Sequence, residues 1–120
     1  MSETRREYDL ENRTLKFSVA ILLFVKKVKI DQINTPLINQ LIRSATSIGA
    51  NYCEANGASS KKDFRNKIYI CKKEAKETKY WLQLIAKTNA EGIEISRQLW
   101  KEAQELTLIF SKIVLSLKNK

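Results

Sequence analysis

The sequence of 120 residues contains no histidine, one proline, three glycines and two cysteines. The absence of histidine excludes Cys2His2 zinc fingers, Cys–His and Ser–His–Asp catalytic groups, and the Glu-x-x-His pairs of di-iron helix bundles. The shortage of proline and glycine disfavours β-rich folds, because these folds need many tight turns. The chain also lacks glycine-rich phosphate loops and dinucleotide fingerprints. We therefore expect an all-α protein that is not an enzyme, has no catalytic residue, and needs no metal or cofactor.

The longest apolar stretch, residues 17–25, is far shorter than the ~20 residues that span a bilayer, and no signal peptide is recognisable. Cys53 and Cys71 form no CxxC pair, and on adjacent antiparallel helices their levels would differ by about 10 Å, too far for a disulfide. They are expected to be small core residues of a cytosolic protein. The predicted localisation is cytoplasmic, with no membrane and no small-molecule substrate as partner.

Apolar residues recur at alternating spacings of three and four, the pattern of helices that bury one face. The pattern predicts one domain, residues 1–120, whose four helices cover about 9–28, 36–56, 61–88 and 95–118, with residues 1–8 frayed. Thr35 before Pro36 is expected to cap the second helix, and Ser60 with Asp63 resembles a capping box for the third. Short connections between four helices predict an antiparallel up-down-up-down bundle.

The first helix is apolar on nearly every side between residues 17 and 25, and a bundle of this size cannot bury one helix completely. The third and fourth helices also carry large apolar side chains outside the regularly spaced positions that are expected to face the core. This surplus predicts a homo-oligomer, and the expected interface residues are Phe17, Ile70, Trp81 and Trp100.

A line of polar residues follows one face of helix 36–56, with little other charge near it. Ser44, Ser47, Asn51 and Glu54 are spaced three, four and three apart, and Arg43 lies beside them. The line could bind a small ligand or a polyanion. The favoured interpretation is structural: Arg43, Ser47, Asn51 and Glu54 form a buried, mutually hydrogen-bonded network that fixes how two helices pack.

Charge is concentrated and sorted on helix 61–88, which carries nine basic and three acidic residues in a chain of net charge +9. Its basic side chains, except that of Lys67, fall on one flank and the back, and its three acidic ones, Asp63, Glu74 and Glu77, fall on the other flank. Lysines bind phosphates and tyrosines stack on exposed bases. The candidate nucleic-acid-binding residues are Lys62, Arg65, Tyr69, Lys72, Lys73, Lys76 and Tyr80. A solvated face that only keeps the protein soluble is the alternative.

Three segments carry a family resemblance: residues 40–55 (QLIRSATSIGANYCEA), 60–64 (SKKDF) and 74–82 (EAKETKYWL). They resemble the bacterial four-helix-bundle family encoded by intervening sequences of 23S rRNA genes, which has carried a ribosomal-protein label and includes accessory proteins of diversity-generating retroelements. Many members have Pro where this chain has Gly49. The resemblance covers nearly the whole chain and implies a pentamer, no known catalysis, and nucleic-acid binding in the retroelement branch.

The sequence therefore predicts a non-enzymatic, oligomeric four-helix bundle that binds itself, as a pentamer, and RNA or DNA through the basic side of helix 61–88. A protein-binding scaffold or accessory subunit with no direct nucleic-acid role remains the alternative.

Overall fold

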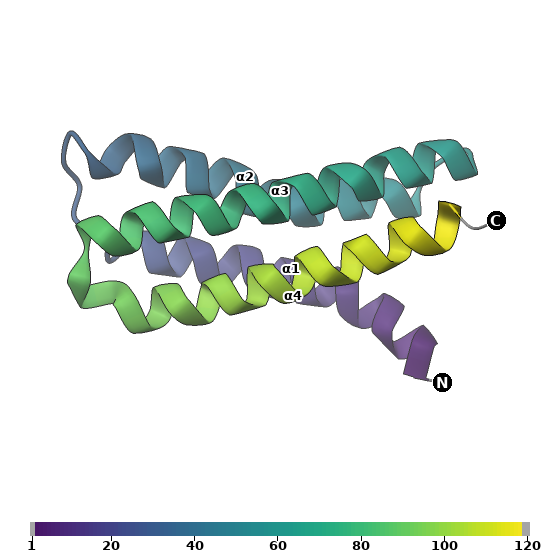
Figure 1. The fold of residues 1–120 in the computed structure, drawn as a ribbon, viewed down its shortest axis with the longest axis horizontal. Helices are drawn as coiled ribbons and strands as arrows, with labels where there is room; N and C mark the ends of the chain where they lie inside the picture. The colour runs from purple at the N-terminus through teal and green to yellow at the C-terminus, as the bar shows by residue number, and fades with distance from the viewer. Residues whose placement is uncertain (1, 119–120) are drawn as a thin grey trace.

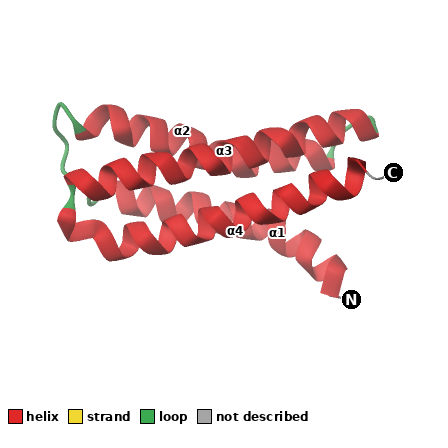
Figure 2. Ribbon diagram, viewed as in Figure 1, coloured by secondary structure: helices red, strands yellow, loops and turns green. Residues whose placement is uncertain are grey.

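The computed structural model describes the backbone of residues 2–118 and the side chains of residues 10–118. Within this part of the chain the structure is helical and contains no strand (Figure 2). The elements in order are α1 (Ser2–Val25), α2 (Asn34–Asn56), α3 (Lys61–Thr88), the short 3-10 helix η1 (Ala90–Gly92) and α4 (Ile93–Lys118). The predicted all-α four-helix bundle is confirmed.

Successive helices run antiparallel, as short connections dictate (Figure 1). The third helix, α3, packs along both α2 and α4, whereas α1 packs mainly on α2 and only slightly on α4. Helices α1 and α3 are therefore diagonal to each other, and each presents an outer face to solvent. The diagonal arrangement decides which side chains are free to bind a partner.

The bounds of α3 coincide with the predicted range, and its start has a clear local cause. Ser60 adopts an extended backbone, and its hydroxyl accepts a hydrogen bond from the amide of Asp63 at 3.0 Å. The start of α2 differs from the prediction. Asp31 Oδ1 accepts from the amides of Ile33 at 3.0 Å and Asn34 at 2.7 Å, so the expected capping role of Thr35 is wrong.

The first helix begins at Ser2 rather than near Asp9, where the apolar pattern placed its start. Glutamate and arginine, which are frequent there, are strong helix formers and extend a helix without an apolar pattern. At its other end α1 stops at Val25, and one further turn leads to Val28, whose amide donates to the Val25 carbonyl at 3.2 Å.

The core runs the length of the bundle and receives large side chains from every helix. Its fully buried members include Ile21, Leu41, Ile68, Leu82 and Phe110. Phe17, which was expected at an oligomer interface, is only 3% exposed and belongs to this core. That prediction is wrong because Phe17 lies on the side of α1 that faces its own bundle. The apolar residues left outside on α1 are Leu15, Val19, Leu22 and Leu23.

Two loops at one end of the bundle are joined by a buried amide. Asn34 is 2% exposed, and its Nδ2 donates to the Lys29 carbonyl at 2.9 Å. Its Oδ1 accepts from Thr88 Oγ1 at 2.8 Å and from Asn89 Nδ2 at 3.2 Å. The connection between α1 and α2 is thereby fixed to the end of α3.

The two cysteines differ in environment, and only one agrees with the prediction. Cys71 is buried, donates to the Ile48 carbonyl at 3.5 Å, and has its pKa raised to about 12, chiefly by burial. Cys53 is exposed beside Glu11 at the outer edge of α2, so its expected core position is wrong. Both thiols are free.

Across residues 2–118, no helix combines the length and the apolar character that crossing a bilayer requires.

Candidate nucleic-acid interface

The charge sorting on α3 has a structural cause on its acidic side. Glu74 and Glu77 face α2, where Arg43 reaches both carboxylates: Nη1 lies 3.4 Å from Glu74 Oε1 and Nη2 lies 2.6 Å from Glu77 Oε1. These contacts, led by the hydrogen bond to Glu77, raise the pKa of the Arg43 guanidinium. The acidic flank of α3 therefore serves to hold α2.

The acidic residues of the neighbouring helices are also engaged with partners of their own. Glu102 and Glu105 of α4 bind Arg13 of α1 at 2.6 and 2.8 Å, and the hydrogen bond to Glu102 is the main cause of the raised pKa of Arg13. Glu54 of α2 binds Lys67 at 3.1 Å. These carboxylates point toward α1 or lie on the α2 side, away from the outer surface of α3.

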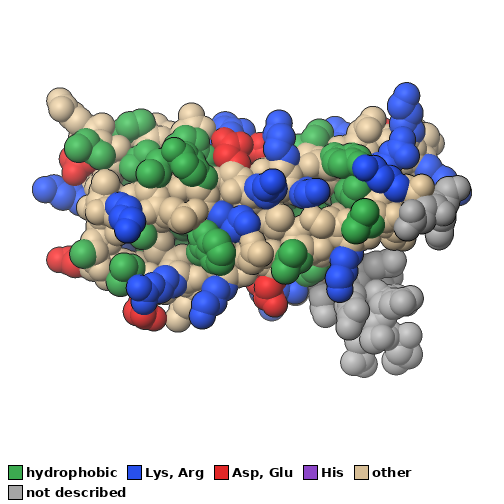
Figure 3. Space-filling model, in the orientation of Figure 1, with side chains coloured by type: hydrophobic (Ala, Val, Ile, Leu, Met, Phe, Trp, Pro, Cys, Tyr) green, Lys and Arg blue, Asp and Glu red, His purple; other side chains and the backbone are tan. Residues whose placement is uncertain are grey.

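The basic face of α3, defined by Lys62, Arg65, Lys72, Lys73 and Lys76, lacks such partners. None of the five forms an ion pair with any described side chain. Lys62, Lys73 and Lys76 are exposed, and the other two are half-buried. Figure 3 shows Lys and Arg side chains distributed along the side of the molecule where α3 and α4 lie in front. The structure thus leaves a row of uncompensated positive charge over about four turns of helix.

The two tyrosines predicted to bind bases occupy different environments. Tyr80 is 56% exposed, and its ring stands edge-on to Trp81 with centroids 5.1 Å apart. Tyr69 is half-buried against the core, and Lys118 Nζ lies 5.7 Å from its ring centroid. Tyr80 is therefore the better placed of the two for stacking on an unpaired base.

The polar line on α2 does not form one buried network, and that prediction is wrong. Arg43 and Glu54 are exposed and pair with α3, whereas Asn51 Nδ2 donates locally to Ser47 Oγ at 2.9 Å and to the Ser47 carbonyl at 2.8 Å. The physical reason is that long charged side chains at the edge of α2 reach carboxylates and amines on α3 more easily than one another. Spacing along one helix cannot reveal such cross-helix partners.

A different polar contact occupies the α2–α3 core. Ser44 is fully buried, and its Oγ lies within hydrogen-bond distance of Thr78 Oγ1 at 2.9 Å, while the Thr78 hydroxyl donates to the Glu74 carbonyl at 2.8 Å. Sequence reasoning placed Ser44 in the polar line but did not identify Thr78 as its partner. One feature of the sequence could have indicated this contact: Thr78 occupies a position of α3 where the regular spacing predicts a buried apolar side chain.

Glu74 makes Arg43 important for stability. The Glu74 side chain is 5% exposed, and its Oε2 is buried without a hydrogen-bond partner among the described residues. We expect Arg43→Ala to lower the free energy of unfolding by about 1–2 kcal/mol, because a buried carboxylate loses its counter-charge while water replaces part of it. Urea unfolding measures the loss, and adding Glu74→Gln should recover much of it. A double variant as unstable as Arg43→Ala would contradict this role.

The three remaining residues predicted at an oligomer interface are each partly covered by their own chain. Trp81 donates from Nε1 to Glu77 Oε1 at 3.2 Å, and Ile70 is half-buried on the same flank. Trp100 lies on α4 with Lys79 Nζ 5.4 Å from its ring centroid. Lys79 also donates to Gln104 Oε1, so this lysine bridges α3 and α4 instead of joining the basic face.

The fold and this surface define an all-α four-helix bundle with one basic outer helix face. Comparison with known families then identifies the chain: residues 6–112 match the family model of the 23S rRNA-intervening sequence protein, and the chain belongs to this family. Its fold is similar to the crystal structure of a protein of unknown function from the S23 ribosomal protein family of Bacteroides thetaiotaomicron. That match has a TM-score of 0.76 and 35% sequence identity, and covers 88% of this chain and 97% of the other. A comparison with curated proteins found no match.

Proposed function

We propose that this chain is a non-enzymatic, homo-oligomeric, cytoplasmic protein that binds RNA or DNA through the basic face of α3. Tyr69 and Tyr80 lie near the bases. The phosphates are bound by Lys62, Arg65, Lys72, Lys73 and Lys76. Contacts to phosphates supply affinity with little sequence specificity. The free, exposed Cys53 and the buried Cys71 thiol fit a reducing compartment.

One observation carries the nucleic-acid proposal: Glu74 and Glu77 of α3 and Glu102 and Glu105 of α4 form ion pairs within the protein, whereas no residue of the basic face pairs with a described side chain. Arg43 forms ion pairs with both Glu74 and Glu77, and Arg13 with both Glu102 and Glu105. A face kept only for solubility needs no such separation, because mixed charges solubilise a protein equally well. A concentrated field of one sign attracts polyanions.

The direct test is a binding titration of the wild-type protein with fluorescently labelled RNA and DNA of random sequence, single-stranded and duplex, over a range of salt concentrations. The proposal expects binding at low salt with log K falling linearly against log salt, by about 0.7–0.9 per phosphate neutralised. Absence of binding to every oligonucleotide at low salt would favour the alternative, a scaffold or accessory subunit that contacts another protein.

Self-association is supported by the outer face of α1. Leu15, Val19, Leu22 and Leu23 are 41–61% exposed and recur at helical spacing on one side of α1. Apolar side chains gathered in this way typically mark an interaction surface. Because α1 is diagonal to α3, burying this stripe leaves the basic face open.

We expect light scattering at micromolar concentration to give a mass of several times 13.9 kDa, with five copies favoured by the family resemblance. Leu22→Lys should dissociate the assembly, because it places a charge inside an apolar contact. The matched variant Leu108→Lys alters an exposed leucine on α4 and should leave the mass unchanged. A wild-type mass of one chain would refute oligomerisation.

A further inference from the structure

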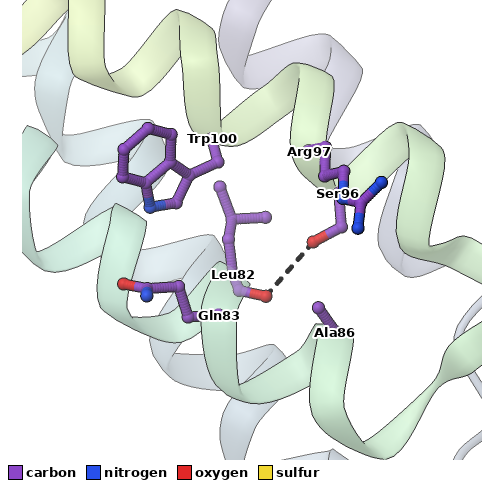
Figure 4. A pocket seen from close by; sticks show the side chains of 6 residues that line it. All are labelled: Leu82, Gln83, Ala86, Ser96, Arg97 and Trp100. Atoms are coloured by element: carbon purple, nitrogen blue, oxygen red, sulfur yellow. Dashed lines mark hydrogen bonds between the residues drawn. The ribbon is translucent and has the colours of Figure 1, made fainter.

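A surface cavity of about 220 Å³ lies between α3 and α4 (Figure 4). It is lined by Leu82, Gln83, Ala86, Ser96, Arg97 and Trp100. Leucine and alanine supply apolar floor, and the flat indole of Trp100 supplies one wall. The Ser96 hydroxyl is already engaged, because it donates to the Leu82 carbonyl at 3.1 Å. The cavity is therefore mostly apolar, as ligand sites generally are, with a few polar groups at its edge.

Trp100 brings an unused donor to this cavity. Its Nε1 atom is buried and has no hydrogen-bond partner among the described residues, which is costly for a buried N–H group. The indole nitrogen lies on the side of the ring toward Gln83, whose exposed side-chain amide can both donate and accept (Figure 4). A ligand with a hydrogen-bond acceptor in a flat ring would accept from Trp100 Nε1 and could form a second hydrogen bond with the Gln83 side-chain amide.

The cavity continues the basic face along α3. Lys72, Lys76, Lys79, Gln83 and Ala86 follow one another at spacings of four, three, four and three, so they lie along one flank of the helix. Lys79 approaches Trp100 from one side, and the cavity lies one turn further along α3, at Gln83 and Ala86. Arg97 of α4 also lines the cavity and forms an exposed ion pair with Glu94 at 3.5 Å.

We propose that this cavity receives one unstacked nucleobase of a single-stranded RNA or DNA whose phosphates follow the basic face. A base has flat apolar faces for Trp100 and ring acceptors for its Nε1, and the strand would lead from the cavity along α3 toward the basic face. An aliphatic ligand would leave the Trp100 N–H unpaired. The bases of a duplex are stacked and cannot enter, so the cavity makes the protein prefer single strands. This inference rests on the proposed nucleic-acid binding.

The test uses tryptophan fluorescence, because the chain has two tryptophans. In a Trp81→Phe protein only Trp100 fluoresces, and in a Trp100→Phe protein only Trp81 does. Each is titrated with a dye-labelled 12-mer of deoxyadenylate or deoxythymidylate and with the duplex of the two, while dye anisotropy reports binding independently. Single strands are expected to quench Trp100 in step with the anisotropy, whereas the duplex should not; any change at Trp81 reports contact with the neighbouring Tyr80 and not with the cavity.

Filling the cavity provides a second readout. Ala86→Leu should reduce the ratio of single-strand to duplex affinity by about tenfold, the order expected for losing one base–aromatic contact. Ala50→Leu makes the same change at an exposed position of α2 and should leave this ratio at the wild-type value. Circular dichroism verifies that both variants are folded.

The possible failures are distinguishable. If single strands bind by anisotropy but Trp100 is not quenched, the cavity does not hold a base, although the proposed function stands. An unchanged affinity ratio in folded Ala86→Leu protein overturns the inference in the same way. If no oligonucleotide binds the wild type at low salt, the proposed function fails and the base site fails with it.

Discussion

Replacement of Lys72, Lys73 and Lys76 by glutamate is expected to reduce nucleic-acid affinity by about tenfold or more at 50 mM salt and to flatten the salt dependence. The slope of log K against log salt should fall by about 2–3, because three phosphate contacts are lost. The fold should persist, since none of the three side chains is buried or forms an ion pair with a described residue. Anisotropy titrations at several salt concentrations measure both effects.

The control for that variant must change the net charge equally at another surface. Lys16 is exposed on α1, diagonal to α3, and Lys27 and Lys29 are exposed in the following loop, at the Thr88 end of α3 and away from Lys62 and Arg65. Their replacement by glutamate should lower affinity through the general field but leave the slope nearly unchanged. Equal loss of slope in both triple variants would mean that net charge, and not the basic face of α3, binds the nucleic acid.

Asn34→Leu is expected to lower the free energy of unfolding by about 2–4 kcal/mol, which corresponds to a melting temperature lower by about 10 °C. The buried amide makes hydrogen bonds to Lys29, Thr88 and Asn89, and leucine can satisfy none of them. The Lys29 carbonyl and the Asn89 amide then lose partners in a place where the loops pack closely. Thermal denaturation at matched protein concentration measures the change.

Asn39→Leu is the matched control, because Asn39 lies on the same helix and is exposed. Its melting temperature should remain within about 2 °C of wild type, as expected for a surface substitution. A similar small change in Asn34→Leu would show that the two loops are held together by apolar packing alone.

Helix α3 shows why some of the fold could be predicted from sequence. Its apolar residues recur at regular spacing between Ser60, a residue type that caps helices, and the Thr88–Asn89 break, so all the information is local. The apolar pattern of helix α1 does not identify a single buried face. Apolar residues surround it, and periodicity could not distinguish Phe17, which faces the bundle, from Val19, which faces solvent. Likewise, the cap at Asp31 competes with a better sequence match at Thr35, and only the loop path decides between them.

The candidate site likewise has features that could be predicted from the sequence of one helix and features that depend on how two helices pack. A helical projection groups Lys62, Arg65 and Lys76 on one side of α3 because their angular positions depend on sequence number alone. It cannot show that Arg43 on α2 neutralises Glu74, since that contact depends on how two helices pack. The cavity beside Trp100 was missed for a related reason: its walls come from two helices, and its volume depends on the side-chain conformations of both.

The limited contact of α1 with α4 has a consequence for folding order and local opening. The α2–α3 and α3–α4 pairs are hairpins of sequence-adjacent helices that pack along their lengths, and such local contacts form early. Helix α1 depends on α2 and on the Arg13 bridge to Glu102 and Glu105. Amide hydrogens of α1 should therefore exchange with solvent at a lower opening free energy than those of α3. We therefore expect the α2–α4 part of the chain to be the most stable cooperative unit and α1 to open first.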